Sequence, residues 1–316
     1  MGLFDVPSIT RHSFAKGLEI LKNPKIINTF SPPSLLQLSL LKTAIAICNH
    51  EIIKKMFQQL KKYLIPEEDN FLQRDAVLKS IKGIGREHVL VLKIPKSVQA
   101  ILIAVFDRRI DEIYIWYLRH RDCLCSDFDE ASSFYWTSEG TIDRLKTAQQ
   151  IVQRNDANEI LRFKMASVYC LETDLESIWR QAMESTKDSP LRTLYHLRQN
   201  SSFDNDYFSH RCSAARLFND EIQLSEDLES IRWSQWQIYW FDKFCGRSIP
   251  CRGLNHSFLL FPRNKGQLLY CLKLFESESR EREILRAATR CLSDIEMLRF
   301  CLPRLNEYDL HRMSMI

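Results

Sequence analysis

A short unit recurs along this 316-residue chain and constrains the fold more than any other feature of the sequence. In its first copy, Ala44 lies in an amphipathic run, a turn containing Cys48 and His50 follows, and Glu51 opens the next run. Four further copies repeat the spacing of an alanine and a following acid, with one inserted residue in the copy at Ala166. The alanines of the five copies are Ala44, Ala104, Ala166, Ala214 and Ala287. Each copy predicts two helices joined by a short turn, with the acid in the first turn of the second helix. The sequence therefore predicts an all-α fold, an elongated stack of helix–turn–helix units.

The composition agrees with a helical prediction. The chain has only 8 Gly and 10 Pro, and 45% of its residues are hydrophobic, enough to bury a large core. Apolar residues recur at helical spacing, and the predicted helices are 35–49, 50–64, 96–106, 110–120, 141–154, 157–171, a helix around 175–184, 191–199, 205–218, 224–244, 266–276, 280–291 and 294–300, with Pro303 closing the array. Residues 71–92 contain the one Gly-x-Gly of the chain. Val89–Leu92 and Tyr114–Tyr117 would also allow β-strands, and strands between residues 86 and 118 would remove the copy at Ala104.

The chain divides into four predicted segments. Residues 1–33 form an N-terminal segment, 34–121 the first helical repeats, 122–140 a loop or linker rich in Asp and Ser, and 141–316 the second helical repeats. Two prolines at the end of the first segment and the N-cap signal Thr141-Ile142-Asp143 mark the predicted starts of the two repeat regions.

Charge and cysteine usage limit the classes of partner. The net charge of +4 comes from acidic and basic residues that alternate, so the sequence does not favour nucleic-acid binding through a clustered basic face. The longest apolar stretch, Val98–Phe106, is too short to span a bilayer. Ten cysteines are scattered, six of them at apolar positions of helical runs: Cys48, Cys170, Cys212, Cys271, Cys291 and Cys301. Together with the absence of a signal-peptide pattern, this predicts a cytoplasmic protein with reduced thiols.

The recurring unit resembles the second half of an ankyrin repeat. The likeness covers Ala44–Phe57, Ala104–Leu118, Ala214–Leu224, Ala287–Leu298 and, more loosely, Ala166–Trp179. The family's Thr-Pro-Leu-His opening is missing and the copies are unevenly spaced, so the resemblance is to a degenerate ankyrin-like or general α-solenoid stack. Trp136–Ala148 and Tyr169–Asp174 are also similar to helical proteins of arachnids without an assigned function. The resemblance implies a binding module, because stacked helix pairs leave an extended surface for partners.

Ser80–Val89 contains the sequence Gly83-Ile84-Gly85, which resembles the turn of a helix-hairpin-helix motif. In that motif the backbone N–H groups hold a nucleic-acid phosphate, and Lys82 and Arg86 would add positive charge. The candidate phosphate contacts are therefore Lys82, Gly83, Gly85 and Arg86. The alternative is an ordinary turn between helices, with glycine ending the first helix.

Trp233, Trp236, Trp240 and Phe244 recur at helical spacing and form one aromatic face. Such a face predicts either an anchor for a protein partner, with the three tryptophans as candidate interaction residues, or the packing of two helices in the core.

Metal and catalytic signals are weak. His120, Cys123 and Cys125 include zinc-ligand types but lack a second ligand pair. The acidic residues Asp127, Asp129 and Glu130 lack the other features of a calcium loop, and a solvated loop explains them. The sequence contains no phosphate-binding glycine loop, dinucleotide motif or nucleophile signature, so we predict no metal, no cofactor and no catalytic residues.

The function predicted from the sequence is a non-enzymatic protein–protein interaction scaffold or adaptor. A nucleic-acid-associated protein that uses the Gly83-Ile84-Gly85 turn is the alternative, and an enzyme of unrecognised class is a third hypothesis, which requires ionisable groups that converge in a pocket.

Overall fold

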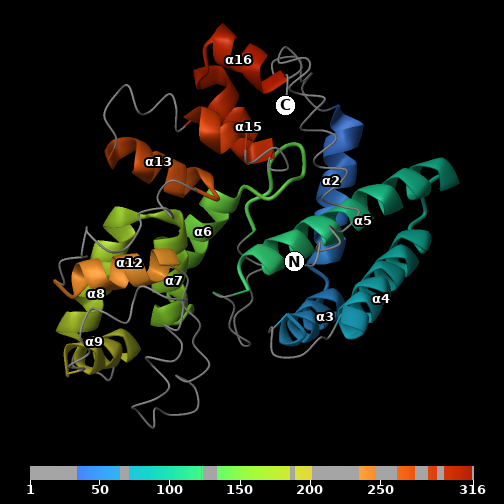
Figure 1. The fold of residues 1–316 in the computed structure, drawn as a ribbon. Coiled ribbons are helices and arrows are strands. Elements are labelled where there is room, and N and C mark those ends of the chain that lie inside the picture. Colours follow the sequence, from blue (N-terminus) through green and yellow to red (C-terminus); the bar gives the residue numbers. More distant parts are fainter. Residues whose placement is uncertain are drawn as a thin grey trace. The chain divides into compact units, whose positions relative to one another are not determined.

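A computed structural model describes residues 34–64, 71–121, 123, 134–185, 189–200, 235–246, 262–274, 284–289 and 295–314. The helices in chain order are α2 (Leu35–Cys48), α3 (Glu51–Lys62), α4 (Phe71–Leu90), α5 (Lys96–Arg119), α6 (Arg144–Gln153), α7 (Glu159–Tyr169), α8 (Glu172–Glu184), α9 (Pro190–Asn200), α12 (Gln235–Phe244), α13 (Lys265–Leu274), α15 (Ile295–Cys301), the 3-10 helix η5 (Leu302–Arg304) and α16 (Glu307–Ser314), and residues 284–289 are also helical (Figure 1). Within these ranges there is no β-strand, only an isolated bridge between Trp136 and Ile142. The all-α prediction is therefore confirmed at this level, whereas the regular stack of repeats stays a prediction.

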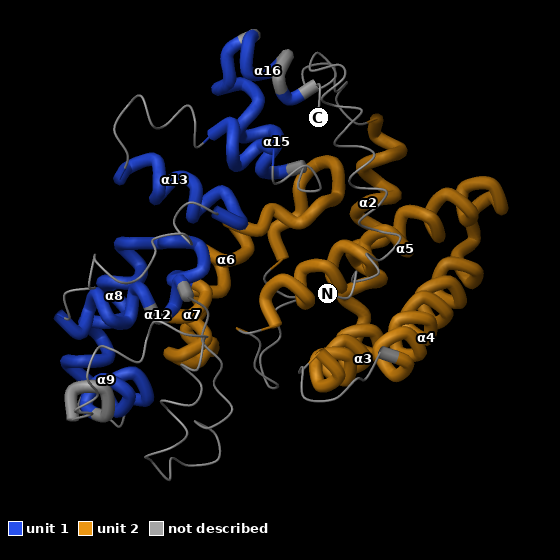
Figure 2. The backbone as a smooth tube through the Cα atoms, viewed as in Figure 1, with its two compact units in different colours: residues 1–31, 166–316 blue, residues 32–165 orange. Residues whose placement is uncertain are grey.

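The described residues belong to two compact units, which Figure 2 shows in different colours. Described residues up to Met165 form unit 2, and those from Ala166 onward belong to unit 1, so the boundary falls inside α7. The predicted linker, residues 122–140, does not coincide with this boundary, and its described part lies within unit 2.

The first copy of the unit forms the predicted helix pair. Ser34 caps α2 through a capping box with Gln37, and Ala44 is fully buried. His50 caps α3, because its Nδ1 accepts the Ile52 N–H at 3.4 Å, and Glu51 stands in the first turn of that helix as predicted. One detail was wrong: Cys48 is the last residue of α2 and is buried, rather than a turn residue.

The helix–turn–helix predicted for the second copy was wrong, because α5 runs without interruption where a turn was predicted between residues 106 and 110. Ala104 is exposed there, unlike the alanines of the other described copies. The buried side chains of α5 continue through the predicted turn as one helical series, Leu102, Phe106, Ile110, Ile113 and Tyr117. This stripe packs against α2 and α4, and that packing stabilises one long helix instead of two short ones. The strands that the sequence left open in this region are absent from the described residues 86–118, which are helical apart from residues 91–95.

The third copy forms a helix–turn–helix from α7 to α8. Ala166 is fully buried, and its carbonyl accepts the Leu171 N–H at 2.9 Å across the turn. The turn residue Cys170 has a positive φ of 52°. The fourth copy, at Ala214, lies outside the described residues, and the fifth keeps Ala287 buried in 284–289, while its turn lies outside them.

Part of the predicted loop is an ordered turn held against α5. The Thr137 N–H donates to the Thr141 carbonyl at 2.9 Å, and Gly140 adopts a φ of 75°. Arg109 of α5, which is only 8% exposed, donates to the Glu139 carbonyl at 3.5 Å. Asp143 then caps α6 by accepting the Lys146 N–H, so the helix begins at Arg144, three residues after the predicted start at Thr141, and Asp143 is the cap instead of a first-turn acid.

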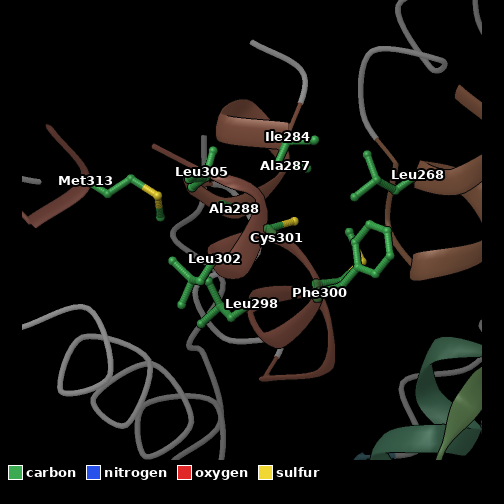
Figure 3. Packing of buried hydrophobic residues seen from close by; sticks show 11 residues of the cluster. Leu268, Ile284, Ala287, Ala288, Leu298, Phe300, Cys301, Leu302, Leu305 and Met313 are labelled. Atoms are coloured by element: carbon green, nitrogen blue, oxygen red, sulfur yellow. The ribbon is translucent and has the colours of Figure 1, made fainter. Parts of the chain in front are cut away.

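The C-terminal helices of unit 1 share a buried cluster, shown in Figure 3. Its members come from α13, residues 284–289, α15, η5, the residue after η5 and α16, and they are Leu268, Ile284, Ala287, Ala288, Met297, Leu298, Phe300, Cys301, Leu302, Leu305 and Met313. The prediction that Pro303 closes the array was wrong. Pro303 lies in η5, and α16 follows and contributes Met313 to the cluster.

Candidate functional site

The Gly83-Ile84-Gly85 segment lies in the middle of α4, and the predicted turn does not exist. The structural reason is the neighbouring helix. Gly85 is buried against the ring of Phe106 on α5, and a Cβ at this position would overlap that ring. Gly85 thus lets two helices approach closely, as glycine does where backbones must meet. Because the N–H groups of this segment lie in the helix interior, they are not presented to a phosphate.

The cations beside these glycines are paired across the α4–α5 hairpin. Lys82 Nζ lies 2.5 Å from Asp111 Oδ1, and Arg86 Nη2 lies 2.6 Å from Asp107 Oδ2. The hydrogen bond from Arg86 to Asp107 is the main cause of the raised pKa of Arg86. Both cations therefore join α4 to α5. The prediction that Lys82, Gly83, Gly85 and Arg86 form a phosphate-binding helix-hairpin-helix turn was wrong, because these residues lie within one continuous helix.

The two ion pairs fix the antiparallel register of the hairpin. As the chain advances along α4 from residue 82 to 86, its partner on α5 moves back from residue 111 to 107. Continuing the register past Arg86 sets Leu90 level with Ile103 and Leu92 level with Ile101. Figure 1 shows α4 and α5 joined at one end by a short connection. Gln99 closes this end, because its side-chain amide donates to the Leu92 carbonyl at 2.9 Å.

Three large apolar side chains are exposed at this end of the hairpin. Leu90 is 60% exposed, Val91 76% and Ile101 50%. We call these three residues the apolar tip. The apolar run Val89–Leu92 is typical of a buried segment, but of Val89, Leu90 and Val91 only Val89 is buried. The available signal was the helical period, because α4 buries residues 77, 81, 85 and 89 and leaves its other face open.

Charged side chains of both signs flank the apolar tip. Glu87 precedes it on α4, and Lys93 and Lys96 follow it in the connection and at the start of α5. All three are exposed, and the described part of the chain provides no ion-pair partner for any of them. The tip thus combines exposed apolar side chains with charged residues beside them in the chain, a combination found at protein contact surfaces.

The predicted aromatic interaction face is packed inside unit 1. Trp236 and Trp240 are 6% and 1% exposed, and both contact the ring of Tyr270 on α13. Phe244 stacks on Trp179 of α8, with ring centroids 5.3 Å apart. Of the two predictions for this face, the structure therefore supports core packing for Trp236 and Trp240, while Trp233 lies outside the described residues.

Thiol and phenol groups gather near this aromatic packing, but their protonation argues against nucleophilic chemistry. The hydroxyls of Tyr239 and Tyr270 are hydrogen-bonded at 2.7 Å, and burial is the main cause of the raised pKa of both. Burial also raises the pKa of the Cys170 thiol, and it raises that of Cys48 in unit 2 to about 12. Because a thiolate is the reactive form of cysteine, burial makes these thiols poorer nucleophiles.

Of the three candidate zinc ligands, the structure describes His120 and Cys123, and both are buried in the core. His120 is buried, and its Nδ1 donates to the Trp116 carbonyl at 2.7 Å, since a carbonyl can only accept. Burial lowers its pKa to about 3. Cys123 is buried, whereas Cys125 and the acidic residues Asp127, Asp129 and Glu130 lie outside the described residues. Among the residues that the structure describes, no three His, Cys, Asp or Glu side chains converge to hold a metal ion.

Comparison with known proteins supplies no relative: no protein-family model, curated protein or solved structure matches this chain. Among the described helices, none combines the length and the apolar character that crossing a bilayer requires.

Proposed function

We propose that this chain is a non-enzymatic protein-interaction adaptor and that the apolar tip of the α4–α5 hairpin is its contact surface. The observation that carries the proposal is the exposure of Leu90, Val91 and Ile101 at one end of the α4–α5 hairpin. An isolated exposed apolar residue is ordinary, whereas a group rimmed by polar residues is typical of a binding surface.

The energetics of the tip favour a partner that covers it. Full burial of a Val, Leu or Ile side chain contributes about 1.5–3 kcal/mol, so three side chains that are already half exposed offer several kcal/mol to binding. The tip is also well positioned for this, because the ion pairs of Lys82 and Arg86 and the packing of Gly85 on Phe106 hold the two helices together behind it. A preordered surface loses little conformational entropy when it binds.

The proposed location of the adaptor is the cytoplasm. Its support is the use of cysteine as a small apolar packing group, as in Cys48, Cys271 and Cys301, which are free and buried. A reducing compartment keeps such thiols in that state.

The test compares proteins captured by three forms of the full chain from cells that express it. The forms are the wild type, the tip variant L90Q/V91Q/I101Q, and the control Leu72→Gln. Leu72 is 77% exposed near the opposite end of α4, so the control removes an exposed apolar group away from the tip. Glutamine is used because it is polar, uncharged and compatible with a helix.

The proposal expects a set of proteins that the wild type and the control both retain and the tip variant loses, with equal helicity of all three forms by circular dichroism. Retention of the same proteins by the tip variant would show that the adaptor function does not use this surface.

A further inference from the structure

The order of negative and positive side chains around the apolar tip indicates which kind of surface can bind it. Along the chain, Glu87 comes first, Leu90 and Val91 are central, and Lys93 and Lys96 follow. Along the axis of α4, Glu87 lies about one turn before Leu90, whereas Lys93 lies in the connection beyond the end of α4 and Lys96 begins α5. The negative group and the two positive groups are therefore on opposite sides of Leu90 along this axis. All of these charged side chains are exposed, and none finds an opposite charge within the described residues.

A partner surface of one sign does not complement this arrangement. An acidic surface would attract Lys93 and Lys96 but repel Glu87, and a basic surface would do the reverse. A surface with the same order of charges, turned by a two-fold rotation, complements both sides at once. Two-fold contacts between identical chains require this self-complementarity.

We propose that the apolar tip binds the apolar tip of a second copy of this chain. A two-fold axis between the central residues places Leu90 and Val91 of the two copies together, and it places Glu87 of each copy near Lys93 and Lys96 of the other. This inference rests on the proposed function, because it names the partner of the same surface.

The association is weak and reversible. The tip has three apolar residues and three rim charges per copy, far fewer than the roughly 20–30 residues per side of a standard stable interface. Exposed ion pairs at its rim add little affinity and are weakened by salt. Their role is to select the register of the two copies.

Sedimentation equilibrium of the full chain tests this inference, at concentrations up to about 300 μM, where a dissociation constant in the micromolar range is readily measured. The wild type is expected to rise from 37.3 kDa toward twice that mass as its concentration increases. The variant L90Q/V91Q/I101Q is expected to weaken association about tenfold or more, whereas Leu72→Gln leaves it unchanged.

Charge reversal supplies a second readout that does not depend on the apolar residues. Glu87→Lys makes the rim wholly positive, and K93E/K96E makes it wholly negative, so each variant alone associates less than the wild type. An equimolar mixture of the two restores association, because opposite rims then meet.

Three results would overturn the inference: a wild type that stays at 37.3 kDa throughout, a tip variant that associates as the wild type does, or a mixture of charge variants that fails to associate. A monomeric wild type whose tip still captures other proteins would overturn this inference alone and leave the adaptor function standing. Loss of both self-association and tip-dependent capture would remove both proposals.

Discussion

Cys170 has a backbone conformation that side chains other than glycine rarely adopt, with a φ of 52°. It ends α7 in the left-handed position after the helix: the Leu171 N–H reaches the Ala166 carbonyl and the Cys170 N–H reaches the Ser167 carbonyl at 3.3 Å. Glycine is the usual residue at this position, because a Cβ costs about 1–2 kcal/mol in the left-handed region. The Cys170 sulfur offsets part of this cost, because it is half-buried and contacts the Ser167 carbonyl oxygen at 3.8 Å.

The first prediction separates backbone strain from packing at Cys170. Cys170→Ala removes the sulfur and keeps the strain, whereas Cys170→Gly removes both. Glycine loses about 0.5–1 kcal/mol through the entropy of the unfolded chain, so the glycine variant should be more stable than the alanine variant by about 1 kcal/mol or slightly less. Urea unfolding midpoints of the two variants measure the difference. An alanine variant as stable as the glycine variant would mean that the turn relaxes out of the left-handed region.

A pH dependence is expected from His120. Burial lowers the pKa of this imidazole from 6.5 to about 3 in the folded chain, against a smaller opposing effect of its hydrogen bond to the Trp116 carbonyl. Below pH 6.5 the unfolded chain binds a proton that the folded chain does not, so stability falls as the pH decreases. The stability contributed by neutral His120 is fully present above pH 6.5 and is lost at about 1.4 kcal/mol per pH unit toward pH 3.

Comparison with His120→Gln isolates this contribution, because glutamine does not titrate. The free energy of unfolding of each form is measured by urea titration between pH 7.5 and pH 4.5. The wild type should lose stability more steeply than the variant by about 1.4 kcal/mol per pH unit below pH 6.5. Parallel pH profiles would show that His120 is accessible to protonation in the folded chain.

At the scale of single elements, α4 contains two glycines with opposite roles. A Cβ at Gly83 meets no atom within 4 Å, whereas a Cβ at Gly85 overlaps the buried ring of Phe106. The same substitution should therefore have opposite effects two residues apart. Gly83→Ala is expected to stabilise the protein by about 0.5–1 kcal/mol through helix propensity. Gly85→Ala is expected to destabilise it by about 1 kcal/mol or more, because overpacking costs about 1–3 kcal/mol.

Urea unfolding of the two variants beside the wild type checks this contrast, and it also tests the continuity of α4. If residues 83–85 formed a glycine-dependent turn, Gly83→Ala would destabilise the chain. Stabilisation by Gly83→Ala with destabilisation by Gly85→Ala is the result that a continuous helix packed on α5 requires.

Sequence reasoning succeeded for elements whose signals are local. The prolines before Ser34 predict the start of α2, and the signal Thr141-Ile142-Asp143 predicts the start of α6 to within three residues, because these signals act within the first turn of a helix. Prediction from the sequence failed where packing against another helix determines the structure. The uninterrupted course of α5 depends on the helices that it packs against, and the exposure of Leu90 and Val91 depends on whether another helix covers their side of the hairpin. The buried period 77, 81, 85 and 89 indicates that Leu90 and Val91 leave the buried face of α4. Spacing does not indicate whether an apolar side chain on the open face serves as a contact surface.

At the scale of the whole molecule, unit 2 has a core of its own centred on α5. This helix packs against α2 and α4, and α3 packs against α4. Fully buried side chains from all of these helices include Ala44, Ile53, Leu60, Ile81, Phe106 and Ile110. A fragment of residues 32–171 keeps these helices and leaves α7 whole, because the boundary between the units otherwise cuts that helix.

The fourth prediction is that fragment 32–171 is helical and unfolds in a single cooperative thermal transition, measured by circular dichroism. A matched fragment of residues 32–95 keeps α2, α3 and α4 but lacks α5. Without the helix on which α2 and α4 pack, it should lose cooperative unfolding and most of its helicity. Equal cooperativity of the two fragments would show that α5 is not the centre of this core.

The sequence by itself determined the helical character of this protein and several helix starts, because apolar periodicity and capping act within one or two turns of the chain. Tertiary structure alone decided that α5 is one helix, that Gly83 and Gly85 continue α4, and that Trp236 and Trp240 are buried while Leu90 and Val91 are exposed. The physical reason is that burial is a relation between elements distant in sequence. The same apolar side chain is core or contact surface according to whether another helix covers it.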